Sequence, residues 1–147
     1  MRKAAALLLI AAATSFATAS DWQCNQAGAA MEATTNEFAR ADGVQVFLVS
    51  DTFLFIAAAC PEEFFRHMKP DVFNVWVSKL EQRTFRVTEE EGEQTETFLS
   101  RLQRKLKKLR FKDPQQEGMR ERLLTEVASM CVRVVDHDKP VHPCRRK

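Results

Sequence analysis

The chain has 147 residues, with 22 basic and 20 acidic side chains and a formal net charge of +2. This balance gives no signature of a nucleic-acid-binding protein. Only four glycines, five prolines and no tyrosine occur, which argues against a sandwich or barrel of many short strands, because those folds need many turn-forming residues.

The first twenty residues have the pattern of a secretory signal peptide. A positive start at Arg2 and Lys3 precedes an apolar core over residues 4–13 and a small-residue exit at Ala19 and Ser20. The core is too short to span a hydrocarbon layer of ~30 Å as a helix, although an uncleaved anchor is the alternative. We predict cleavage after Ala19 or Ser20 and a periplasmic or secreted protein.

Removal of residues 1–20 takes away two basic side chains and leaves 20 basic and 20 acidic ones. The remaining residues 21–147 have a length typical of one domain. We expect a single helical domain, with an extended C-terminal tail over residues 136–147.

Four cysteines follow the signal segment, at positions 24, 60, 131 and 144. An even number of cysteines in an exported chain predicts two disulfide bonds, and three pairings exist in principle. We favour Cys24–Cys144, which would join the two ends of the mature chain. Cys60–Cys131 would then join the ends of two apolar helical segments.

The N-terminal half of the mature chain contains two predicted helices. Residues 26–40 are rich in alanine and end near Gly43. Residues 44–59 are apolar on every side, so periodicity cannot distinguish one buried helix from two short strands. We predict a helix, because the run is long and ends in three alanines. Asp51 at its centre, together with its length, argues against a transmembrane span.

Two shorter helices are expected next. Pro61 begins a helix that stops before Pro70, since proline is favoured in a first helical turn. Residues 71–84 carry an apolar stripe on one helix face. The segment near 84–99 is ambiguous: it is either a small β-hairpin or, as we slightly prefer, a polar loop that feeds the next helix.

The last two helices are predicted at 97–111 and 114–135, separated by Asp113 and Pro114. Each has leucines, methionines or valines at spacings of three and four residues. Since every helix has one face to hide, the predicted fold is an all-α, small disulfide-stapled bundle of about five helices.

Basic side chains gather on the helix predicted at 97–111, after a run of glutamates. This order suits the helix dipole, and a solvated helix face is its commonest origin. The functional interpretation is a surface for an acidic or envelope protein, or for a membrane surface. No aromatic residues interrupt the basic side chains, so no nucleic-acid partner is expected. The candidate partner-binding residues are Arg101, Arg104, Lys105, Lys107 and Lys108.

The C-terminal tail holds His137 and His142 beside Cys144 and two aspartates. These are suitable atoms for a Zn²⁺ or Cu²⁺ site, but their spacing matches no specific ligand pattern. We favour a tail stapled by an oxidised Cys144, so the two histidines are weak metal candidates and no cofactor is expected.

No catalytic motif is present, and no catalytic residue is named. Three functions remain: an exported, non-enzymatic helical protein that binds another protein in the bacterial envelope, a periplasmic metal-binding protein that uses the tail histidines, and a small envelope hydrolase without a recognisable motif. We favour the first, which includes inhibitors, immunity proteins, chaperones and assembly subunits.

Overall fold

A computed structural model describes residues 24–80, 84–87 and 89–134, and the side chains of residues 24–80 and 94–130. The predicted signal segment, the tail over 136–147 and its two histidines lie outside the described residues. None of the helices in the described ranges has the length and hydropathy that a membrane crossing requires.

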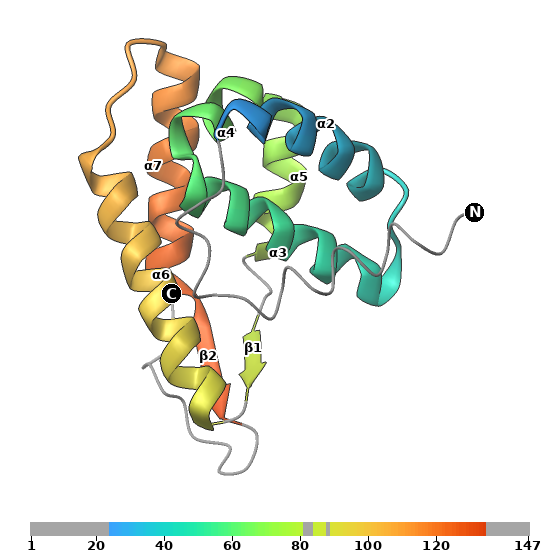
Figure 1. Ribbon diagram of the computed structural model, residues 1–147, viewed down its shortest axis with the longest axis vertical. Coiled ribbons are helices and arrows are strands. Elements are labelled where there is room, and N and C mark those ends of the chain that lie inside the picture. The colour runs from blue at the N-terminus through green and yellow to red at the C-terminus, as the bar shows by residue number, and fades with distance from the viewer. Residues whose placement is uncertain (1–23, 81–83, 88, 135–147) are drawn as a thin grey trace.

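The described chain is a small all-α bundle, as predicted, with six α-helices rather than about five (Figure 1). A short 3-10 turn, η2 (Cys24–Gln26), leads into them. The helices are α2 (Ala27–Phe38), α3 (Gly43–Ala59), α4 (Pro61–His67), α5 (Pro70–Leu80), α6 (Glu89–Lys108) and α7 (Pro114–Ser129).

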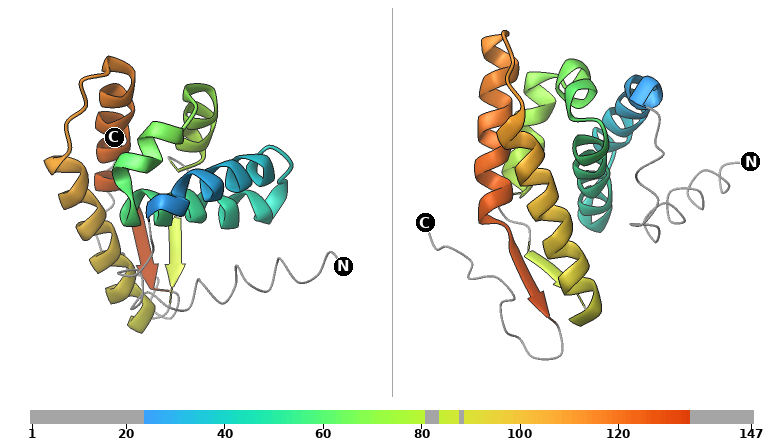
Figure 2. Two further views of the ribbon diagram at one scale, coloured as in Figure 1. Left: turned by 45° about the horizontal axis from the view of Figure 1, so that its top comes forward. Right: turned by 60° about the vertical axis from the view of Figure 1, so that its left-hand side comes forward.

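The helices form two antiparallel pairs with shorter helices between them. α2 runs back along α3, and α6 runs back along α7, while α4 and α5 lie between the pairs (Figures 1 and 2). Short connections produce these pairs, since helices joined by a few residues pack as antiparallel neighbours.

The apolar run at 44–59 is one helix, as predicted, but only its second half is buried. Phe53, Leu54 and Ile56 are each at most 3% exposed, whereas Val44 and Leu48 in the first two turns are 76% and 65% exposed. The predicted buried helix is therefore half core and half surface.

Trp76 of α5 is the centre of the core. Its indole ring lies 5.4 Å from Phe53, 5.5 Å from Phe64 and 5.8 Å from Phe73, measured between ring centroids. The indole N–H donates a hydrogen bond of 3.2 Å to the carbonyl oxygen of Ser50. Trp76 thus joins α3, α4 and α5, and its one polar atom has a partner, as buried indoles require.

Neither alternative for the segment near 84–99 is correct, the possible hairpin or the slightly preferred polar loop. A strand does form, β1 (Thr84–Val87), but its partner is β2 (Cys131–Val134), and the two strands are parallel, with Thr84 opposite Cys131. The residues that would have formed the second half of the hairpin belong to α6, which begins at Glu89 and not at residue 97. Glutamates have good helix propensity and are favoured near a helix N-terminus.

The last helix is shorter than predicted. It ends at Ser129, whereas the sequence suggested residue 135, and the chain continues as β2. The valines at 132 and 134 favour a strand because their side chains are branched at Cβ. A parallel partner for β1 needs a long crossover, and the α6–α7 hairpin provides it.

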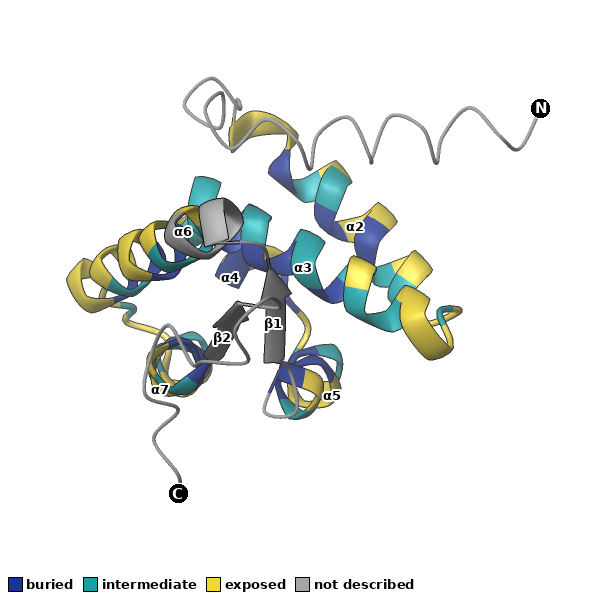
Figure 3. Ribbon diagram, turned by 90° about the horizontal axis from the view of Figure 1, so that it is seen from below, coloured by how far each residue is buried: buried dark blue, intermediate teal, exposed yellow. Residues whose placement is uncertain are grey.

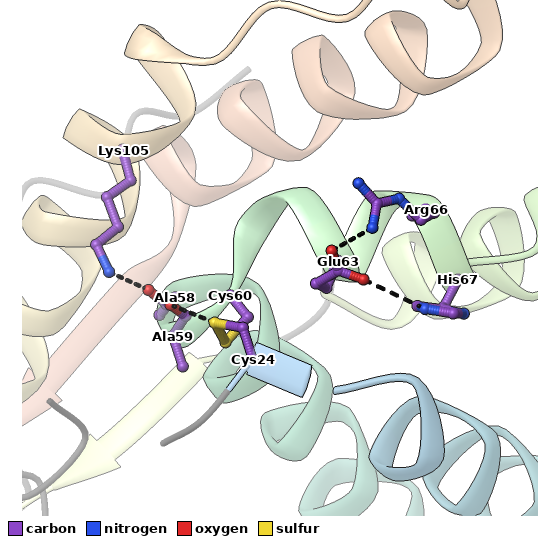
Figure 4. The surroundings of a disulfide bond; sticks show 8 residues. All are labelled: Cys24, Ala58, Ala59, Cys60, Glu63, Arg66, His67 and Lys105. Atoms are coloured by element: carbon purple, nitrogen blue, oxygen red, sulfur yellow. Dashed lines mark hydrogen bonds and ion pairs between the residues drawn. A yellow bond between two sulfur atoms is a disulfide. The ribbon is translucent and has the colours of Figure 1, made fainter. Parts of the chain in front are cut away.

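The predicted disulfide pairing is wrong. Cys24 is bonded to Cys60, with their Cα atoms 5.5 Å apart, so neither Cys24–Cys144 nor Cys60–Cys131 forms (Figure 4). The cause is the antiparallel pairing of α2 and α3, which brings the first residue of η2, the turn that precedes α2, next to the residue just after α3.

Candidate functional site

One face of α6 is buried in the core, so the opposite face of the helix points to solvent. Leu99, Leu102 and Leu106, at spacings of three and four residues, are at most 6% exposed and pack into the core. The residues on the other side of the helix are exposed (Figure 3). The leucine spacing therefore sets which basic side chains face solvent.

All five predicted partner-binding residues lie on α6 and are exposed. Lys105 differs from the other four, because its ammonium group donates a hydrogen bond to the carbonyl oxygen of Ala58 (Figure 4). Ala58 is in the last turn of α3, where carbonyls lack helical partners and favour a cation. Lys105 therefore ties α6 to α3.

The other four side chains form what we call the basic face: Arg101, Arg104, Lys107 and Lys108. Within the part of the chain whose side chains are described, none of them forms an ion pair or a side-chain hydrogen bond. Arg104 is three residues from Arg101 and from Lys107 and four from Lys108, so the four are neighbours on one side of the helix. The result is a strip of uncompensated positive charge.

Positive charge continues past the end of α6. Arg110 is exposed, and its guanidinium donates hydrogen bonds to the carbonyl oxygens of Lys107 at 2.8 Å and of Leu109 at 2.5 Å. These contacts cap the helix C-terminus, a position that favours cations. Lys112, two residues later, is exposed as well.

A buried arginine, which we did not anticipate from the sequence, holds the α6–α7 turn. Arg120 of α7 is 4% exposed. Its guanidinium donates to both carboxylate oxygens of Glu117, at 3.0 Å and 2.5 Å, and to the carbonyl oxygen of Leu106 at 3.1 Å. Bidentate arginine–carboxylate pairs are among the strongest hydrogen-bonded contacts in proteins.

Glu117 also accepts a hydrogen bond of 2.9 Å from the backbone N–H of Phe111. The hydrogen bonds from Arg120 first, and from Phe111 second, lower the pKa of Glu117 from an ordinary 4.5 to about 2. We call Phe111, Glu117 and Arg120 the turn mount. A glutamate three residues before an arginine on a helix is a visible sequence signal, but it does not reveal that the arginine is buried.

Among the hollows of the described surface, two shallow ones adjoin α4. The first, of about 280 Å³, lies between α4 and the α6–α7 turn, and its lining residues are Glu62, Arg66, Leu109, Arg110, Phe111 and Gln116. The second, of about 290 Å³, lies between α2 and α4 and is lined by Gly28, Glu32, Thr35, Asn36, His67 and Lys69.

His67, the last residue of α4, lies against Gly28 of α2. Its imidazole Nε2 is 3.4 Å from the carboxylate of Glu63, and a Cβ atom at Gly28 would come within 3.0 Å of the ring. Within the described ranges, no three His, Cys, Asp or Glu side chains are grouped so that they could hold a metal ion. The metal candidates His137 and His142 are outside those ranges.

No protein-family model, curated protein or solved structure matches this chain.

Proposed function

We propose that this protein is an exported, non-enzymatic helical protein of the bacterial envelope, and that it binds an acidic partner protein through the basic face of α6. The observation that carries the proposal is the set of four exposed cations on one rigid helix, with no acidic partner among the described residues.

The free protein bears an energetic cost for this arrangement. Like charges three or four residues apart on a helix destabilise it by about 0.2–0.5 kcal/mol per pair. Arg104 has such neighbours on both sides, at Arg101 and at Lys107 and Lys108. Carboxylates from a partner would relieve this repulsion, whereas mixed charges on the helix would have avoided it.

Three other cations of the bundle make contacts that the basic face lacks. Arg66 pairs with Glu63, Arg120 pairs with Glu117, and Lys105 binds a helix carbonyl. These contacts contribute to the fold. The basic face contributes no such contact within the described part of the chain, which supports a role outside the folded monomer.

Binding through this face would depend on salt. Charges across an interface mainly steer encounter and fix orientation, and each exposed ion pair contributes only about 0–1 kcal/mol. Because charges are screened over ~10 Å at 0.1 M salt, we expect association to slow as salt rises.

Export is supported by the signal pattern and by the Cys24–Cys60 bond, since disulfides persist mainly in oxidising compartments. An envelope extract is therefore the appropriate source of partner.

The test is capture of an envelope protein by the immobilised mature chain. We expect R104Q/K107Q/K108Q to capture less of it than wild type does. The matched control is R40Q/K69Q/K79Q, which removes the same charge from three exposed sites on other parts of the molecule and should behave as wild type. Equal capture by both variants would refute the proposed surface, and no specific capture by wild type would refute the function.

A further inference from the structure

Surface charge alone seldom produces tight binding. Exposed ion pairs are screened, and most of the affinity of an interface comes from a few groups that fill desolvated pockets. A partner held through the basic face therefore needs an anchor nearby.

The hollow between α4 and the α6–α7 turn meets this requirement. Arg110 lines it and is also in contact with the last turn of α6, because its guanidinium donates to the carbonyl oxygen of Lys107 at 2.8 Å. Arg110 thus lies between the C-terminal end of the basic face and the hollow.

The lining combines two kinds of chemistry. Leu109 and Phe111, both half-buried, supply apolar surface, and Arg66 and Arg110 supply two guanidinium groups. Glu62 contributes one carboxylate, so the lining residues themselves sum to a charge of +1. Arg66 is also paired with Glu63, which lies just outside the lining. A ligand that matches this lining carries a negative charge beside an apolar body.

The wall of the hollow is rigidly held. The Phe111 ring packs edge-on against Phe65 of α4, with the centroids 5.3 Å apart. Its backbone N–H donates to Glu117, which Arg120 holds in two hydrogen bonds. A wall fixed before binding costs less ordering when a ligand arrives.

We propose that this hollow is the anchor site for the partner, and that it takes an amphipathic carboxylate: a side chain or chain end in which a carboxylate adjoins an apolar or aromatic group. The inference rests on the proposed function and specifies its partner. The acidic segment would lie along the basic face, and its apolar-bodied carboxylate would bind between Arg66 and Arg110.

The experiment uses the isotope-labelled mature chain and phenylacetate as the probe, followed by nuclear magnetic resonance. We expect saturable shifts of the Phe111 and Gln116 amide signals. Phenylacetamide lacks the charge and acetate lacks the ring, and both should bind roughly tenfold more weakly, as expected for loss of a charge-assisted contact or of the apolar one.

Two variants assign the effect to the arginine. R66Q should weaken phenylacetate binding, and E63Q/R66Q, which keeps the net charge of wild type, should weaken it equally. K79Q, on the exposed side of α5, is the matched control and should bind as wild type. Each spectrum also reports whether the variant is folded.

The inference is overturned if phenylacetate gives no saturable shift, if phenylacetamide binds equally well, or if both Arg66 variants bind like wild type. This outcome is separable from failure of the proposed function. If the anchor fails while R104Q/K107Q/K108Q still loses the envelope partner, only the anchor is refuted.

Discussion

The two helix pairs of this bundle are fastened by different chemistry. The α2–α3 pair is joined to the start of α4 by a covalent bond, Cys24–Cys60, whereas the α6–α7 turn is held by Glu117 and Arg120. The first fastening is sensitive to reductant and the second to acid. The basic face, which has no acidic partner among the described side chains, lies on α6 of the second pair, next to this turn.

The largest expected effect is loss of the disulfide. C24S/C60S opens a loop between residues separated by 36 positions, and the chain-entropy estimate for such a loop is about 4 kcal/mol of stability. Urea denaturation measures this change. A loss below about 1 kcal/mol would show that α2 is held by packing alone.

Because the Cys24–Cys60 bond uses two of the four cysteines, Cys131 and Cys144 must pair with each other if the exported chain holds no free thiol. Non-reducing peptide mapping should then give the pairs 24–60 and 131–144. Cys144 is outside the described residues, so this pairing follows from counting the remaining cysteines. Two free thiols would contradict it.

The turn mount should be the next most sensitive feature. Arg120→Ala leaves Glu117 and the Leu106 carbonyl without their partner, and we expect a loss of about 3 kcal/mol, in the range for charged hydrogen bonds that are partly buried. Arg104→Ala is the matched control on the exposed side and should stay within about 0.5 kcal/mol. Equal losses of stability from the two substitutions would mean that Arg120 in the turn mount supports the fold no more than Arg104 on the basic face does.

Acid should weaken the mount and leave the disulfide intact. The pKa of Glu117 is about 2 in the fold and 4.5 in the unfolded chain. A lowered folded pKa gives stability that is complete above pH 4.5 and is lost as pH falls toward 2. Urea midpoints over this window should fall less steeply for Glu117→Gln than for wild type. If the two proteins had the same pH dependence, the contacts of Glu117 in the turn mount would not contribute to stability.

The smallest expected effect is on stability when the basic face is neutralised. R104Q/K107Q/K108Q removes like-charge repulsion, so we expect the free energy of unfolding to stay level or rise by a few tenths of a kcal/mol. Thermal denaturation at low salt measures it. A clear loss of stability would mean that these side chains support the fold.

Local sequence signals predicted most of the helices. Asp113 illustrates this, because its carboxylate accepts hydrogen bonds from the N–H groups of Gln115 and Gln116, at 2.7 Å and 3.1 Å, and begins α7 where the sequence placed a boundary. The leucine spacing likewise predicted which side of α6 is exposed. Both signals lie within one or two helical turns.

The wrong predictions involve residues far apart in sequence. The Cys24–Cys60 bond depends on how α2 and α3 pack against each other, and the partner strand of β1 follows α6 and α7 in the chain. The candidate site also includes a contact between residues far apart in sequence. Lys105 has the composition of the basic face, but its contact with Ala58 of α3 gives it a structural role, and no local pattern reveals that contact.

The most direct test of the central claim is the association rate of the captured partner with three proteins: wild type, R104Q/K107Q/K108Q and the control R40Q/K69Q/K79Q. We expect wild type and control to associate rapidly at low salt and to slow together as salt approaches 0.1 M, where the screening length is ~10 Å. The α6 variant should associate slowly at every salt concentration. If it associates as fast as wild type at low salt, the basic face is an idle solvated surface and the contact lies elsewhere.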